Sequence, residues 1–198
     1  MTIKIGLIVE CERDGADQRV CEHLVSRLRP NSDVITVTMG GKPNLINGCG
    51  DVAAQLLRES CERVIVVWDL YPPWRRGNAP CRRDDRLLVY QSLEQAGVSS
   101  PPVEIVCIRE ELEAWLVADN RAISMAIQKL IGRRVRINEM KDPERVKNPK
   151  VRLRKIFAEH THRQYQEHID ALRIIRELPD LKRIRRAQSF VRFASKIS

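Results

Sequence analysis

The chain of 198 residues is long enough for one domain with a substantial core, and its 43% hydrophobic and 31% charged residues are typical of a soluble globular protein. No apolar run approaches the roughly 20 residues that span a bilayer, and the apolar part of the N-terminus is too short for a signal peptide. We therefore expect a cytoplasmic protein without a membrane partner. The six cysteines contain no C-x-x-C pair and no close histidine, which argues against a structural zinc site.

The formal net charge of +9 is divided unevenly along the chain. Residues 1–120 contain 14 Lys/Arg and 18 Asp/Glu, a net of −4, whereas residues 121–198 contain 21 and 8, a net of +13. This division indicates catalytic carboxylates in the first part and a surface for a polyanion, DNA or RNA, in the second. The alternative is a set of solvated helices with long basic side chains. The basic residues expected to contact nucleic acid here are Arg152, Lys182, Arg183, Arg185 and Arg186.

Strand and helix signals alternate through the first 120 residues. The expected strands cover residues 3–9, 33–38, 63–69 and 103–108, and the expected helices cover residues 14–28, 50–60 and 84–96. Alternation of this kind predicts an α/β fold, a parallel sheet with helices on both faces. Beyond residue 119 the pattern predicts helices over residues 121–131, 149–158, 164–178 and 181–197, with a loop over 130–150. We expect an α/β domain over residues 1–120 and a basic helical extension, packed on it, over residues 121–198.

The stretch from Arg63 to Asp69 is the centre of the expected sheet. Its run of β-branched and aromatic residues does not alternate with polar ones, which suits a strand buried on both faces. The run ends at Asp69, and Pro72 and Pro73 prevent further pairing. Open α/β sheets bind their ligands at the carboxyl ends of such strands, so Asp69 is a candidate site residue. The alternative is a helix cap or a turn former.

Three expected strands end in carboxylates, and in a parallel sheet these ends lie along one edge. The carboxylates are Glu10, Asp69 and the cluster of Glu110, Glu111 and Glu113. Gathered acids repel one another unless protons or a cation intervene, and a hard divalent cation, Mg²⁺ or Mn²⁺, is the usual solution. Two alternatives stay open. Glu10 can interact with the dipole of the following helix, and part of the cluster can open a helix of its own.

At these motifs the chain resembles a known domain. Gly6-Leu-Ile-Val-Glu10 followed by Val66-Val-Trp-Asp69 is similar to the Toprim pattern, shared by topoisomerases, bacterial primases, recombination proteins and the overcoming-lysogenization-defect nucleases. Further segments resemble the small RloB-like Toprim family, often found beside anti-phage genes. They are Asp69-Leu-Tyr71 before prolines, Glu111-Leu-Glu113-Ala-Trp115-Leu-x-x-Asp119, and Pro149-x-x-Arg152-Leu153. The resemblance covers about residues 3–155, and the E-x-E-A-W segment is its most specific part.

The resemblance implies a Toprim-like, Rossmann-like fold and a metal-dependent nuclease with a role in anti-phage defence. Glu10 and Asp69 would be the catalytic residues, and the metal ligands would be Glu10, Asp69, Glu111 and Glu113. The loop after Asp69 carries arginines that can neutralise the scissile phosphate. These are Arg75, Arg76, Arg82 and Arg83.

The sequence departs from the Toprim pattern in two places. Leu70 and Tyr71 follow Asp69 where Toprim enzymes usually have a second aspartate, so one ligand is missing or comes from Glu111 or Glu113. Cys11 also replaces the glycine beside the first glutamate. The alternative function is therefore a non-catalytic module that binds nucleic acid or an ATPase encoded nearby. The sequence does not support a phosphatase or a nucleotide-binding enzyme, because it has no Gly-rich phosphate loop. The sequence leaves the oligomeric state open.

Overall fold

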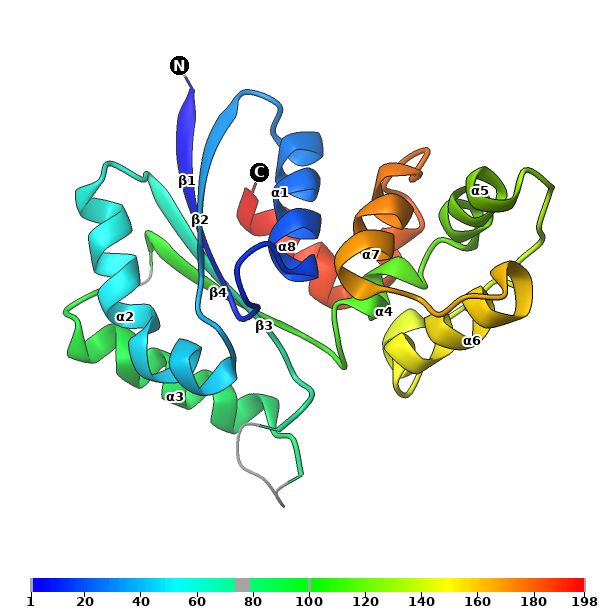
Figure 1. The fold of residues 1–198 in the computed structure, drawn as a ribbon. Coiled ribbons are helices and arrows are strands. Elements are labelled where there is room, and N and C mark those ends of the chain that lie inside the picture. Colours follow the sequence, from blue (N-terminus) through cyan, green and yellow to red (C-terminus); the bar gives the residue numbers. More distant parts are fainter. Residues whose placement is uncertain (1, 74–78, 100, 198) are drawn as a thin grey trace.

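The computed structural model describes residues 2–73, 79–99 and 101–197. Its centre is a four-stranded, all-parallel sheet in the order β2-β1-β3-β4 (Figure 1). The strands are β1 (Ile3–Val9), β2 (Ser32–Thr38), β3 (Arg63–Asp69) and β4 (Val103–Ile108). The α/β fold class predicted from the alternating pattern is confirmed, and the fold is compatible with a Rossmann-like arrangement.

Helices connect and extend the strands. In chain order they are α1 (Ala16–Leu28), α2 (Lys42–Arg58), α3 (Arg82–Gln95), α4 (Glu113–Leu116), α5 (Asn120–Ile131), α6 (Pro149–Thr161), α7 (Glu167–Arg176) and α8 (Gln188–Ile197), with short 3₁₀ helices η1 (Pro143–Arg145) and η2 (Ile184–Arg186). Helices α2 and α3 cover one face of the sheet, and α1 and α8 cover the other (Figure 1). None of the described helices is long and apolar enough to cross a membrane.

Alternating side chains of the central strands belong to two separate hydrophobic cores, one on each face of the sheet. From β1, Leu7 and Val9 belong to the core beneath α1 and α8, whereas Ile8 belongs to the core beneath α2 and α3. The second core is tight where its two helices cross. A Cβ atom on Gly50 of α2 would lie 2.0 Å from the carbonyl oxygen of Ser92 on α3, so only glycine fits there.

Two predicted helix boundaries are wrong. Helix α2 begins at Lys42 and not at residue 50. Pro43 fits in its first turn, because the backbone N–H groups there have no acceptor within the helix and the missing N–H of proline costs nothing. The glycines before it, Gly40 and Gly41, take positive φ angles and make the turn from β2. The helix expected over residues 181–197 is divided into η2 and α8, because Ala187 between them is extended.

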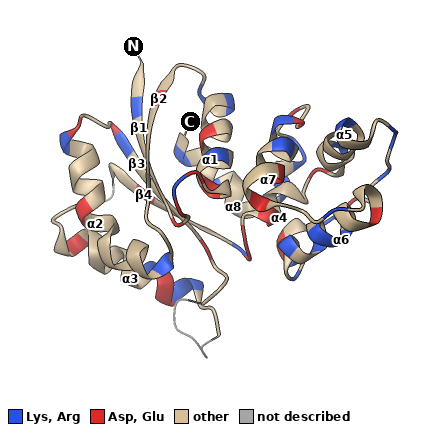
Figure 2. Ribbon diagram, viewed as in Figure 1, with Lys and Arg blue, Asp and Glu red and all other residues tan. Residues whose placement is uncertain are grey.

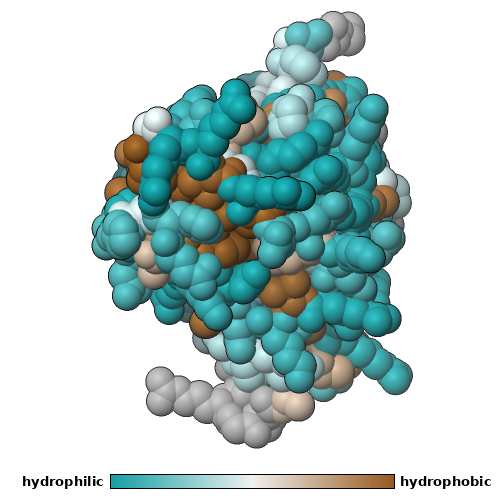
Figure 3. Space-filling view, turned by 90° about the vertical axis from the view of Figure 1, so that its right-hand side faces the viewer, coloured by the Kyte–Doolittle hydropathy of each residue, from teal (hydrophilic) through white to brown (hydrophobic). Residues whose placement is uncertain are grey.

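The helices beyond residue 120 form a layer beside the sheet, and α8 returns to it. Helices α5, α6 and α7 lie on the right of Figure 1, and the side they present is largely hydrophilic with small apolar patches (Figure 3). Helix α8 packs against α1 and β4. Trp115 of α4 donates a hydrogen bond from Nε1 to Oγ of Ser189 (2.8 Å) and contacts Phe190 and Phe193. One core thus includes residues from both predicted parts, and their division at residue 120 stays a prediction.

Candidate functional site at the carboxyl edge of the sheet

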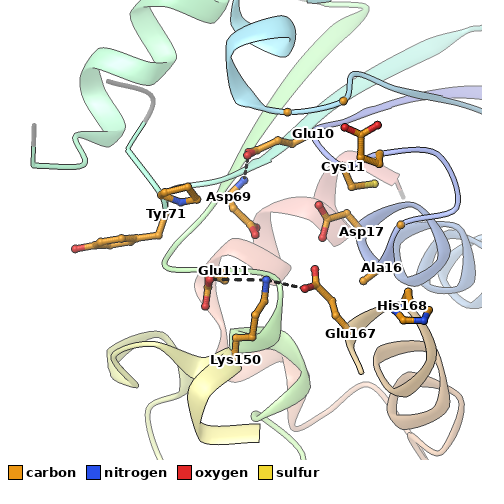
Figure 4. Close-up of a pocket in the computed structure, with 15 residues that line it drawn as sticks. Glu10, Cys11, Ala16, Asp17, Asp69, Tyr71, Glu111, Lys150, Glu167 and His168 are labelled. Carbon is orange, nitrogen blue, oxygen red and sulfur yellow. Dashed lines mark hydrogen bonds and ion pairs between the residues drawn. The ribbon is translucent and has the colours of Figure 1, made fainter. Parts of the chain in front are cut away.

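A cavity of about 390 Å³ opens at the carboxyl ends of the strands (Figure 4). The strand register aligns these ends, because Val9 pairs with Val67 and Thr38 while Asp69 pairs with Ile108. Six carboxylates line the cavity, from the loops after β1 and β4, from the end of β3, and from the first turns of α1 and α7. They are Glu10, Glu12, Asp17, Asp69, Glu111 and Glu167. The structure therefore brings the predicted residues Glu10, Asp69 and Glu111 to one place.

Glu10 and Asp69 are directly linked. The backbone N–H of Asp69 donates a hydrogen bond to Oε2 of Glu10 (3.1 Å). Burial raises the pKa of Glu10 to about 7, and the positive charge of Lys42 limits that rise. A carboxyl group with this pKa exchanges its proton near neutral pH.

The carboxylate of Asp69 is incompletely hydrogen-bonded. Its Oδ1 is buried and has no hydrogen-bond partner in the described part of the chain. Burial raises the pKa of Asp69 well above its usual range, and the negative charges of Asp17 and Glu10 raise it further. A buried carboxylate oxygen without a partner is unfavourable, so a proton or a cation at this atom would stabilise it.

Glu113 has a different position from Glu111. Its side chain is only 1% exposed and is not among the residues that line the cavity. The hydroxyl of Tyr165 donates a hydrogen bond to its Oε1 (3.3 Å), and burial raises its pKa to about 8. Of the two glutamates favoured by the family resemblance, Glu111 faces the cavity and Glu113 lies behind it.

Lys150, in the first turn of α6, supplies a positive charge to the cavity. Its Nζ lies 2.8 Å from Oε2 of Glu167 and 3.9 Å from both Oε1 of Glu111 and Oε1 of Glu113 (Figure 4). Burial opposes the charge of Lys150, but the charge of Glu113 and the contacts with Glu167 outweigh it and raise its pKa. The single positive charge of this ammonium group is therefore shared among several carboxylates.

Sequence reasoning missed five charged or titratable residues of this cavity, namely Glu12, Asp17, Lys150, Glu167 and His168. Burial raises the pKa of Asp17 to about 6, with a further contribution from Glu167. Glu12 and Asp17 stand at the start of the first helix, where acids are common because they interact favourably with the helix dipole. The other three come from the basic C-terminal region, and Lys150 occupies an unspecified position of the Pro149-x-x-Arg152-Leu153 segment.

A second lysine near the site, Lys42, is buried and contacts the backbone just beyond Asp69. Its Nζ donates hydrogen bonds to the carbonyl oxygens of Leu70 (2.8 Å) and Pro72 (2.7 Å) and lies 3.5 Å from Oδ2 of Asp85. Asp85 also accepts a hydrogen bond from Nε1 of Trp68 (3.3 Å). Lys42 is thus a structural residue that fixes the backbone beside the site.

Cys11 lines the cavity beside Glu10, but it is not a nucleophile. Burial raises the pKa of its thiol to about 12, and the charge of Asp17 adds to the rise. The reactive thiolate is therefore absent at neutral pH.

The predicted basic residues lie in several places. Arg75 and Arg76 lie outside the described residues, and Arg82 and Arg83 are exposed at the start of α3. Arg152 is half-buried on α6. The remaining group differs from what was expected. The guanidinium of Arg183 donates to Asn120, and that of Arg186 donates to Glu139 and to the carbonyl oxygen of Ala118. Lys182 and Arg185 stay exposed. Figure 2 shows many Lys and Arg residues on α6 and α7, close to the acidic start of α4.

No group of three or more His, Cys, Asp or Glu side chains is arranged as a ready metal site within the described ranges. The cavity carries more acid than its cations balance, and its oxygen atoms are spread around its walls (Figure 4).

The fold and the cavity define an α/β protein with a parallel sheet and a carboxylate-lined site at its carboxyl edge. A family model, the domain of unknown function DUF4276, matches residues 17–198, and the chain belongs to this family. The matched region includes Asp17, Asp69, Glu111, Lys150 and Glu167 of the cavity, and it begins after Glu10. No curated protein and no solved structure matches the chain.

Proposed function

We propose that the protein is a metal-dependent nuclease that hydrolyses nucleic-acid phosphodiesters at the carboxyl edge of the sheet. The observation that carries the proposal is the convergence of Glu10, Asp69 and Glu111 on one cavity in which a buried carboxylate oxygen has no partner. A Toprim-like site of the RloB-like kind is consistent with the positions of Glu10 and Asp69. A role in anti-phage defence, with an ATPase encoded nearby, rests on that resemblance alone.

The donor set fits a hard divalent cation. Its atoms are carboxylate oxygens, the ligands that Mg²⁺ and Mn²⁺ prefer, and the free Oδ1 of Asp69 is the atom that most needs a cation. Glu10, Asp69 and Glu111 would hold the ion, and Glu113 would support them through Lys150. When bound, the ion supplies Lewis-acid chemistry, because it polarises a phosphoryl oxygen and makes water a stronger acid.

The side chains of the cavity supply the other functions. Glu10 is held against the backbone of Asp69, and it can accept or return a proton near neutral pH. Lys150 stands among the carboxylates as an internal counter-charge, so a divalent cation would compete with it for Glu111. Exposed basic side chains, including Lys182 and Arg185, would attract the phosphate backbone from outside the acidic cavity.

The direct test is cleavage of end-labelled single- and double-stranded DNA and of RNA, each with Mg²⁺, with Mn²⁺ and with a chelator. We expect metal-dependent cleavage of at least one substrate and a loss of about 100-fold or more in Asp69→Asn and in Glu10→Gln, as for removal of a catalytic electrostatic group. Asp51→Asn, an exposed aspartate on α2, is the matched control and should keep the wild-type rate.

Cleavage that persists in the chelator or in Asp69→Asn would overturn the proposal. A second function is favoured by one observation, namely that Tyr71 stands where Toprim enzymes usually have an aspartate. Metal-independent binding of nucleic acid, without cleavage of any substrate, would establish the non-catalytic binding module.

A further inference from the structure

A second cavity lies at the open edge of the sheet, away from the carboxylates. It measures about 170 Å³ and lies beside β4, which pairs only with β3 in the described structure. Helix α3 contributes to it from one face of the sheet and α8 from the other. The lining residues are Arg82, Arg86, Tyr90, Glu104, Ile105, Cys107, Arg192 and Lys196, and none of them lines the acidic cavity.

The charge of this second cavity is not balanced. Glu104 is the one acid among its described lining residues, and it is already bound to Nζ of Lys196 (2.6 Å). The guanidinium groups of Arg82, Arg86 and Arg192 form no ion pair within the described ranges, and Glu144, which does not line the cavity, is the acid whose charge favours the protonated form of Arg192. Three guanidinium groups from two helices thus face one small space whose lining has a net positive charge.

Arg192 shows how unfavourable this arrangement is without an anion. Its side chain is half-buried on α8, and burial lowers its pKa. The positive charges of Arg82 and Arg86 contribute to the lowering. Like charges gathered in a partly buried place repel one another, and an anion between them would remove that repulsion.

An exposed aromatic and aliphatic surface adjoins the arginines. Tyr90 and Leu87 are 41% and 57% exposed on α3, and they line a neighbouring hollow of about 350 Å³ together with Arg82, Arg83, Arg86 and one acid, Asp84. The guanidinium of Arg86 lies 5.8 Å from the centroid of the Tyr90 ring, and its Nη2 lies 3.4 Å from the tyrosine hydroxyl. The ring is therefore held at the mouth of the basic cavity.

We propose that this arginine cavity binds the phosphate group of a nucleotide, either free or within a nucleic-acid strand, with the base placed on Tyr90 and Leu87. Guanidinium groups match phosphate oxygens with paired N–H donors, which makes arginine the preferred residue for such recognition. An exposed aromatic ring beside a phosphate site is a stacking platform for a base of any sequence. The site is separate from the acidic cavity and does not depend on the proposed nuclease activity.

The test measures binding of inorganic phosphate, adenosine monophosphate, adenosine and a tetranucleotide to the full chain by calorimetry, at constant ionic strength and in the presence of a chelator. The variants are Arg192→Gln and Arg86→Gln. Arg58→Gln, which removes an exposed arginine on α2, is the control with the same change in charge. Arg86 is exposed on the surface of α3, so its variant is informative even if Arg192→Gln folds poorly.

We expect the monophosphate to bind at least tenfold more weakly to both cavity variants than to wild type and Arg58→Gln. Tyr90→Ala should weaken the binding of adenosine monophosphate and leave the binding of inorganic phosphate unchanged. A tetranucleotide that binds much more tightly than the monophosphate identifies a nucleic-acid strand as the ligand, whereas equal affinities identify a free nucleotide. The proposal is overturned if adenosine binds as tightly as its monophosphate, if no phosphate compound binds, or if the cavity variants match Arg58→Gln.

Discussion

Two lysines, the buried Lys42 and the half-buried Lys150, stand near the same edge of the sheet, and their surroundings differ in one respect. Lys42, 3% exposed, forms one ion pair, with Asp85, and donates hydrogen bonds to two backbone carbonyl groups. Lys150 faces three carboxylates, and further acids stand close by. Charge and hydrogen bonds are balanced around Lys42 and are not balanced around Lys150.

This difference separates a structural ion pair from a candidate functional site. A balanced buried pair needs nothing from solution, and removing either partner leaves an uncompensated charge. An unbalanced group stays incomplete until protons or a cation bind, which is the property of a site that works by exchanging them. The comparison leads to predictions for each lysine and for the acids around it.

The largest expected effect concerns Lys42. Lys42→Met should lower the free energy of unfolding by about 3–5 kcal/mol, because Asp85 and two carbonyl groups lose their buried partner. Lys150→Met should lower it less, because the neighbouring carboxyl groups can take up protons instead. Urea unfolding of both variants at pH 7 measures the difference. An equal or larger loss in Lys150→Met would remove the distinction between the two sites.

A smaller effect is expected from pH. The folded-state pKa values of Glu10 and Glu113 are about 7 and about 8, above their ordinary value of 4.5, so the folded protein holds more protons than the unfolded chain between these limits. Stability of the metal-free protein should therefore fall as pH rises from about 4.5 to about 8, by several kcal/mol in order of magnitude. Urea unfolding across this range measures it. Stability that rises over the window would contradict these protonation states.

The smallest stability effect should come from Asp69. In the metal-free protein at pH 8, Asp69→Asn should raise the free energy of unfolding by about 1–2 kcal/mol, because the amide avoids the cost that burial and the neighbouring acids impose on the Asp69 carboxyl group, which is ionised in the unfolded chain. Asp51→Asn, on the exposed face of α2, should have little effect. Thermal unfolding of the two variants side by side measures the gain. A loss of stability in Asp69→Asn would show that its carboxylate is already satisfied.

The sequence predicted the sheet more completely than the site. Four apolar runs alternating with amphipathic segments specify a parallel sheet, and a strand that ends at Asp69 must place that carboxylate at the shared edge. The position of Lys150 could not be predicted in this way, because it depends on how α6 packs beside the sheet. Asp17 was overlooked because an acid in a first helical turn has an ordinary explanation. The segment Gly40-Gly41-Lys42-Pro43 has the composition of a turn, and only the structure shows that Lys42 is buried and binds the backbone after Asp69.

The central claim is that the carboxylates around Asp69 form a divalent-cation site, and direct titration with Mn²⁺ tests it. Mn²⁺ is followed by its paramagnetic resonance signal, which the bound ion loses. We expect one class of site in the wild type, at least tenfold weaker binding in Asp69→Asn, and wild-type binding in Asp51→Asn. Lys150→Met should bind the ion more tightly, since a competing cation is gone. Equal Mn²⁺ affinities in the wild type and Asp69→Asn would contradict the claim.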